Sequence, residues 1–168
     1  MKTLVCAFLL AVSLSGCAGY RLGEVKPAYL KEVRSIAVPT FKNHTFLPRI
    51  EALVTNTVIK QFQQDGTFRI ASEDNADAVL RCAITTVGRN PARSVRGNVL
   101  ATTEFNLGLL VTYTLVGRDG KTLAGPTGVS GTTSFFVSSD VTTEERQALP
   151  LAAEDMAVRL VSQLSEGW

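Results

Sequence analysis

Few residues in this sequence stand in patterns that could do catalytic chemistry. His44 is the only histidine among 168 residues, so any histidine-based triad would depend on it. Residues 117–122 end like a phosphate-binding loop, but that motif needs a glycine where Leu115 stands. Ser130 lies between two glycines without the spacing of a nucleophile elbow. We therefore expect no enzyme, no cofactor and no metal site.

One thiol does stand in a chemically specific pattern. Lys2 gives a positive start, residues 4–14 form an apolar run, and Ser15 and Gly16 then precede Cys17. A signal peptide normally ends in small residues, and a cysteine directly after them is typical of bacterial lipoproteins, in which the sulfur receives a diacylglycerol before cleavage. The sequence predicts a signal peptide over residues 1–16 and lipidation of Cys17. The alternative is an ordinary signal peptide followed by an incidental cysteine.

Lipidation at this position would decide where the protein lies. Two or three acyl chains, at about 0.8 kcal/mol per buried methylene, anchor a protein without a membrane-spanning helix. Ala18 follows the cysteine, and because an aspartate there favours the inner membrane, we expect attachment to the periplasmic side of the outer membrane. Cys6 would leave with the signal peptide, so Cys82 would be the only unmodified thiol and no internal disulfide could form.

Arginines gather between positions 78 and 103, a segment without acidic residues. They are Arg81, Arg89, Arg93 and Arg96. The last three fall in residues 88–99, which we interpret as a loop between two strands. A guanidinium can hold two oxygens of a phosphate or carboxylate at once. The loop could therefore meet an anionic glycolipid or a carboxylate-rich partner, or it could be an ordinary solvated loop.

Composition limits the remaining classes. The 17 Lys and Arg residues against 15 Asp and Glu residues give a net charge of +2. Nucleic-acid binders that rely on bulk charge are strongly basic, so we expect no nucleic-acid partner. No stretch reaches the roughly 20 apolar residues of a spanning helix. The length fits a single domain.

The elements that position these residues follow from apolar spacing. Alternation predicts strands at 34–41, at 68–71, from 78 onward, at 102–117 and at 130–138, with Cys82 packed inertly on a core face. Helical spacing predicts a helix over 48–65 and another near the carboxyl end, with a capping box from Thr142 to Glu145. Because a proline inside a helix costs about 3 kcal/mol, we expect a break at Pro150.

This order of elements predicts an α/β fold, specifically an α+β two-layer sandwich. Two helices would pack on one face of a mixed, mostly antiparallel sheet of about four to five strands. Residues 17–32 would be an acylated tether and residues 33–168 one domain. The opposite face of the sheet keeps Leu110 and Val116, which indicates that something else covers it.

Several short motifs occur along the chain in a fixed order. They are residues 16–22, 36–39, 48–51, 65–67, 134–136 and 155–157, with Asn43, Leu160 and Leu164. As an ordered set they resemble the LptE family of lipopolysaccharide-assembly lipoproteins, and the resemblance spans essentially the whole mature chain.

The resemblance implies a specific role. A protein of this kind would sit largely inside the barrel of the outer-membrane translocon protein LptD, as a plug, and the two would insert lipopolysaccharide into the outer leaflet. Lipopolysaccharide would bind basic residues near one end of the sheet: Arg96 best matches that position, with Arg93 and Arg89 as neighbours that could share it. A second basic site expected near the final helix is not evident, because Glu144 and Glu145 lie there.

Two other classes stay open. A peptidoglycan-synthase activator or a curli-type secretion lipoprotein can share the lipidation motif and an early strand like residues 36–39. A small-molecule carrier of the periplasm is the other. Co-purification of a large barrel would favour the lipopolysaccharide-assembly role, and recovery of an apolar ligand would favour the carrier.

Overall fold

The computed structural model describes residues 26–95, 98–137 and 140–167. Its elements are η1 (Ala28–Leu30), β1 (Ser35–Ala37), β2 (Lys42–Asn43), α2 (Ile50–Asp65), β3 (Arg69–Ile70), β4 (Ala78–Val95), β5 (Asn98–Gly117), β6 (Thr122–Phe136) and α3 (Val141–Ser165). The predicted signal peptide, Cys17 and Arg96 lie outside the described residues.

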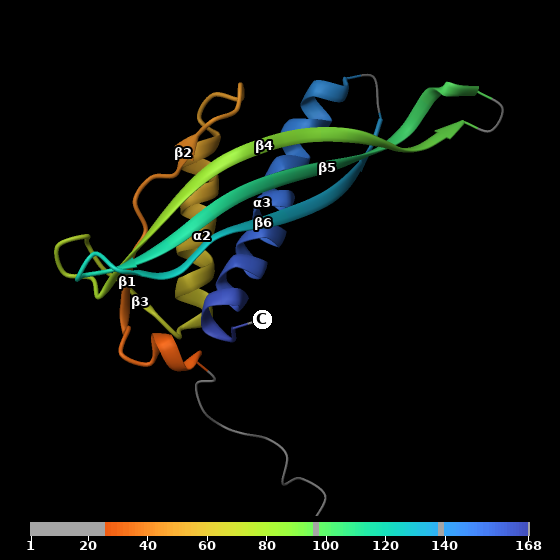
Figure 1. The fold of residues 1–168 in the computed structure, drawn as a ribbon. Helices are drawn as coiled ribbons and strands as arrows, with labels where there is room; N and C mark the ends of the chain where they lie inside the picture. Colours follow the sequence, from red (N-terminus) through yellow and green to blue (C-terminus); the bar gives the residue numbers. More distant parts are fainter. Residues whose placement is uncertain (1–25, 96–97, 138–139, 168) are drawn as a thin grey trace, which may run out of the picture.

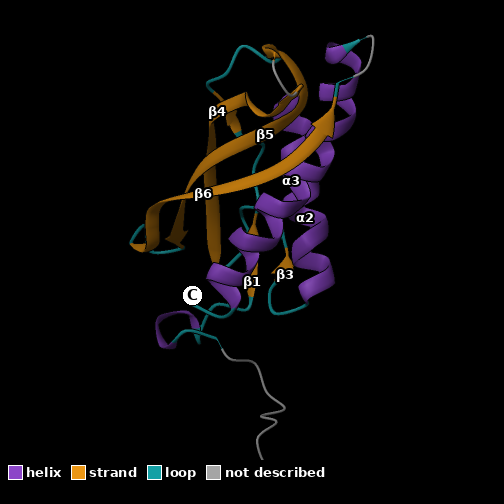
Figure 2. Cartoon of the chain, turned by 90° about the vertical axis from the view of Figure 1, so that its right-hand side faces the viewer, coloured by secondary structure: helices purple, strands orange, loops and turns teal. Residues whose placement is uncertain are grey.

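A mixed sheet and two helices form two layers. The strand order is β3-β1-β4-β5-β6, with β2 pairing on β4, which makes a 6-stranded sheet. β1 pairs in parallel with both β3 and β4, and β2 pairs in parallel with β4, whereas the β4–β5 and β5–β6 pairs are antiparallel. Both α2 and α3 lie on one face of the sheet (Figure 2). The predicted α+β two-layer fold is confirmed, with six strands once the two-residue β2 is counted.

The core lies between the helices and the face of the sheet that carries the predicted alternation of β5. Leu107, Leu109, Val111 and Leu115 are buried there. At Gly131 of β6 the helix comes unusually close: an added Cβ would overlap the carbonyl oxygen of Ala152 and lie 2.6 Å from Cβ of Met156. Glycine is therefore what allows α3 to lie directly on β6.

The first predicted strand, 34–41, is divided. β1 ends at Ala37, and the chain rejoins β4 only at β2. Pro39 has no N–H to give to a sheet, so it marks the interruption. The connection is fixed by α2, because the N–H of Phe41 donates to Oγ1 of buried Thr55 at 3.0 Å.

The first long helix, α2, matches its prediction to within two residues. It begins at Ile50 instead of residue 48, because Arg49 adopts the left-handed conformation with φ 67°. It ends at Asp65 and is capped by Gly66, whose φ of 77° only glycine adopts easily and whose N–H donates to the Phe62 carbonyl at 3.0 Å.

The predicted break at Pro150 is wrong, because α3 runs unbroken from Val141 to Ser165. The proline removes one helical hydrogen bond, but the residues after it bury a long apolar face that includes Met156 and Leu160. Tertiary packing thus offsets the local cost. The cap also differs from the predicted box: Oδ1 of Asp140 accepts the N–H groups of Thr142 and Thr143, at 3.0 and 3.2 Å.

The predicted loop at 88–99 is also wrong. β4 continues to Val95 and β5 begins at Asn98, so the two strands form a long arm that projects past the helices (Figure 1). Beyond Ile84, where the pairing with β2 ends, β4 has β5 as its only partner among the strands described. An edge strand tolerates a proline such as Pro91. Likewise β6 starts at Thr122, not at 130, and includes the glycine-rich segment.

The 3-10 helix η1 precedes residue 33, the start of the predicted domain. The 3-10 helix η1 contributes Leu30, which is fully buried in the core. The last part of the predicted tether is therefore packed against the domain. Across the residues described, no helix combines the length and the apolar character needed to cross a membrane.

Candidate functional site

The β4–β5 arm places the predicted arginines on opposite faces of the sheet. Arg89 stands opposite Leu107, which belongs to the core side. Arg93 stands opposite Glu104, on the side away from the helices. The chain around Arg93 is irregular, with register shifts on both sides of it. The arm therefore does not present Arg89 and Arg93 as one cluster, and Arg96 lies outside the described residues.

Arg89 is engaged by the protein itself. Its guanidinium forms an ion pair with the carboxylate of Glu145 in the first turns of α3. The same guanidinium lies 5.4 Å from the ring centroid of Phe105, and that ring stacks on Phe135 at 5.8 Å. These contacts hold the arm against α3, so we assign Arg89 a positioning role. Less of its guanidinium is then available to bind a ligand.

Arg93 is far more available. Its side chain is 71% exposed, and Nε lies 3.7 Å from Oε2 of Glu104. Exposed pairs of this length contribute little to stability, so the guanidinium can turn to an external anion at small cost. The sequence showed a segment without acidic residues, but pairing brings Glu104 and Glu145 to it, so the expected excess of positive charge is partly neutralised.

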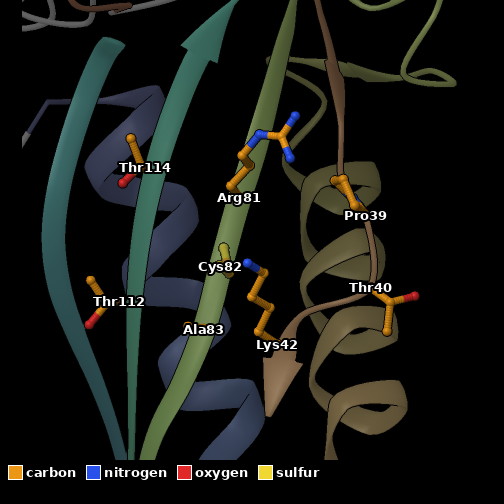
Figure 3. A pocket seen from close by; sticks show the side chains of 8 residues that line it. All are labelled: Pro39, Thr40, Lys42, Arg81, Cys82, Ala83, Thr112 and Thr114. Atoms are coloured by element: carbon orange, nitrogen blue, oxygen red, sulfur yellow. The ribbon is translucent and has the colours of Figure 1, made fainter. Parts of the chain in front are cut away.

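A second basic group lies on the side of the sheet without helices. Lys42, Arg81, Thr112 and Thr114 line a pocket of about 240 Å³ beside the divided first strand, next to Pro39 and Thr40 (Figure 3). Among the described residues, neither Lys42 nor Arg81 forms an ion pair with a carboxylate. Two cations and two hydroxyl groups suit an oxyanion such as a carboxylate or a phosphate.

Strand register explains why these residues meet. Lys42 pairs with Ala83 across β2 and β4, and Ala83 pairs with Thr112 across β4 and β5. Arg81 is two positions before Ala83 and opposite Thr114, so all five share one face. The short Ala83 side chain leaves space between the two cations. We call this side of β4, β5 and β6, which also carries Leu110 and Ser130, the helix-free face.

Sequence reasoning identified Arg81 but missed Lys42. The two residues are far apart in the chain, and no local spacing connects them. Only the parallel pairing of β2 with β4 brings them together. The chain leaves the sheet between β1 and β2 before this pairing begins. No short sequence motif indicates in which register β2 then pairs with β4.

The structure also places the other candidate groups. Cys82 is 7% exposed on the core side, as predicted, and burial raises the pKa of its thiol. His44 is exposed, and its backbone N–H donates to the Ile84 carbonyl at 3.0 Å. Within the described ranges, no three His, Cys, Asp or Glu side chains gather in a way that could hold a metal ion.

Comparisons with known proteins agree with this architecture. The family model described as "LptE: Lipopolysaccharide-assembly" matches residues 33–164. No curated protein matches the sequence. Solved structures are similar in fold at low sequence identity, as the following three show.

Protein XCC0632 from Xanthomonas campestris is 15% identical with a TM-score of 0.58, covering 84% of this chain and 90% of that one. A minor lipoprotein from Acinetobacter baumannii is 18% identical with a TM-score of 0.53, covering 80% and 92%. The dodecamer of a PelC point variant from Paraburkholderia phytofirmans is 17% identical with a TM-score of 0.53, covering 79% and 89%. At such identities the likeness concerns the fold alone.

Proposed function

Because the chain belongs to the LptE family of lipopolysaccharide-assembly proteins, we propose that it acts in lipopolysaccharide transport at the outer membrane. Its partner would be an LptD-like barrel, which it would enter as a plug and help to assemble. The observation that carries this proposal is the family match over residues 33–164, which includes every strand and nearly all of both long helices. The role is binding and assembly, with no catalytic step.

The anchor is part of the proposal. Acylation of Cys17 would hold the domain at the periplasmic side of the outer membrane, beside the barrel it serves. The lumen of a large barrel is polar and wet, and a chain whose net charge is only +2, with a polar sheet face, is compatible with such a space. The family match favours this role over a peptidoglycan-synthase activator, a curli-type secretion component or a periplasmic carrier.

Lipopolysaccharide would bind at the end of the β4–β5 arm. Arg93 supports this assignment, because it is exposed and its one ion pair among the described residues is the long pair with Glu104. Arg96 follows three residues later and is assigned with it. Arg89 serves a different purpose in this scheme, since its ion pair with Glu145 fixes the arm against α3.

The test compares two double variants that remove the same charge. Arg93→Ala/Arg96→Ala should lower the affinity of the purified protein for lipopolysaccharide by about a hundredfold, since hydrogen bonds to charged groups contribute about 1.5–3 kcal/mol each and every 1.4 kcal/mol is tenfold. The control is Arg34→Ala/Arg69→Ala, at exposed positions near β1 and β3, the end away from the arm (Figure 1). Equal affinity of the two variants would remove the ligand role.

Two further measurements test the location and the partner. Labelled palmitate should enter the wild-type chain and not a Cys17→Ser variant. Tagged protein extracted from membranes should bring down a large barrel, identified by mass. Recovery of a penicillin-binding protein or of a ring of identical subunits would contradict the proposal.

A further inference from the structure

Charge is divided between the two layers of the domain. The helices α2 and α3 together carry six acidic and three basic side chains. The strands carry five basic side chains and one acidic side chain. That acidic residue is Glu104, and it already pairs with Arg93. The sheet layer would therefore attract an acidic partner, and the helix layer would repel it.

The shape of the helix-free face also suits close contact with another surface. Across β5 and β6 its residues are mostly small and polar, for example Asn106, Gly108, Thr112, Thr114, Ser130 and Thr132. The larger apolar side chains among them include Leu110 at 39% exposure and Phe136 at 66% exposure. A face of this composition fits a polar wall better than the apolar interior of a bilayer, because its hydroxyl groups would lose their hydrogen bonds to water in lipid.

Two cations stand at one side of this face. Lys42 and Arg81 are both exposed, and both line the pocket shown in Figure 3. Arginine matches a carboxylate in two parallel hydrogen bonds, and the lysine beside it adds a second positive charge. Thr112 and Thr114 offer hydroxyl groups from the neighbouring strand.

We propose that the helix-free face is the surface that this protein applies to its barrel partner, with Lys42 and Arg81 binding carboxylates on the partner's inner wall. This inference rests on the proposed function, and it adds which face makes contact and which chemistry the partner presents there. The acidic helix layer then faces away from that part of the wall. Arg93, which lies twelve positions beyond Arg81 along β4, is left for lipopolysaccharide.

The experiment uses the full acylated chain expressed with its barrel partner. Lys42→Glu/Arg81→Glu should lower the amount of barrel recovered with the tagged protein by about tenfold, because two attractive contacts become repulsive. The matched control is Lys60→Glu/Arg146→Glu, which makes the same change of charge at exposed positions of α2 and α3. The control should recover the barrel to within about twofold of wild type. The neutral variant Lys42→Gln/Arg81→Gln should lie between them.

A second readout does not depend on binding strength. A photo-crosslinking residue placed at Ser130, on the helix-free face, should join one segment of the barrel wall, and a residue at the exposed Gln64 of α2 should not join that same segment. Affinity for lipopolysaccharide should be unchanged in Lys42→Glu/Arg81→Glu, which separates this face from the arm.

The outcomes distinguish the two proposals. If wild type recovers the barrel and Lys42→Glu/Arg81→Glu recovers it equally, the face assignment is wrong while the proposed function stands. Crosslinking from Gln64 but not from Ser130 would likewise overturn the assignment. If wild type recovers no barrel, the proposed function fails and this inference fails with it.

Discussion

Replacing Gly131 with alanine tests how closely α3 lies on the sheet. The added Cβ would overlap the carbonyl oxygen of Ala152 and the amide nitrogen of Met156, which are both backbone atoms of α3. A side chain can rotate away from such a clash, but helix backbone must move as a unit. Overpacking of a core costs about 1–3 kcal/mol, and we expect the upper end of that range here.

The loss converts into a measurable shift in urea denaturation. A denaturant slope of about 2 kcal/mol/M is ordinary for a small domain, so a loss of about 3 kcal/mol lowers the midpoint by about 1.5 M. The measurement uses the mature chain with Cys17 replaced by serine, followed by circular dichroism.

Gly128→Ala is the control on the same strand. Its added Cβ would meet only Cδ1 of Leu110, at 3.8 Å, which is ordinary contact. We expect its free energy of unfolding to stay within about 0.5 kcal/mol of wild type. If Gly131→Ala and Gly128→Ala had equal midpoints, the described contact between α3 and β6 would be wrong.

Two other predictions concern titratable groups. Asp77 Oδ2 accepts hydrogen bonds from the N–H of Arg34 and from both the N–H and the hydroxyl of Ser35, at 2.8 to 3.0 Å. These hydrogen bonds lower the pKa of the carboxyl below 3.8; the Ser35 hydroxyl contributes most and the Arg34 N–H next. Because the folded pKa is depressed, the stabilisation is present above the unfolded pKa of about 3.9 and disappears as pH falls through the folded value. Asp77→Asn should therefore lose about 1–2 kcal/mol at pH 7, and a difference from wild type that stayed constant down to about pH 2 would contradict the assignment. Cys82 should resist alkylation at about pH 8 in the folded Cys17→Ser chain and react fully in urea, since burial raises its pKa; stoichiometric labelling of folded protein within minutes would show that the thiol is accessible.

Sequence patterns predicted those parts of the fold in which one face is buried along a whole element. The alternation of β5 and the spacing of α2 each report a continuous apolar face, and both elements appear where expected. Two of the predictions that failed, the break at Pro150 and the loop at 88–99, concern segments that contain a proline. Pro150 stays inside α3 because the following turns are buried, and Pro91 stays inside β4 because that part of the strand is an edge.

The candidate site was harder to predict than the fold, because its geometry depends on pairing between distant segments. The arginine-rich segment was visible in the sequence, but its partner Glu145 lies 56 residues away from Arg89. The pairing of Lys42 with Ala83 was equally hidden. Sequence reasoning therefore found the basic residues of the arm. It did not show that Arg89 pairs with Glu145 on α3 while Arg93 stays largely exposed.

If Cys17 is acylated as proposed, the burial of Leu30 limits the length of the tether between the lipid and the domain. The described part of the domain begins at Lys26, which is only nine positions after Cys17. At no more than about 3.6 Å per residue, that segment reaches at most about 32 Å. The end of the domain near η1 must then stay within that distance of the leaflet, while the tip of the arm projects at the opposite end (Figure 1). A short tether of this kind would fix the distance from the membrane at which the arm meets its ligand. Residues inserted into the tether would widen the range of that distance without changing the fold.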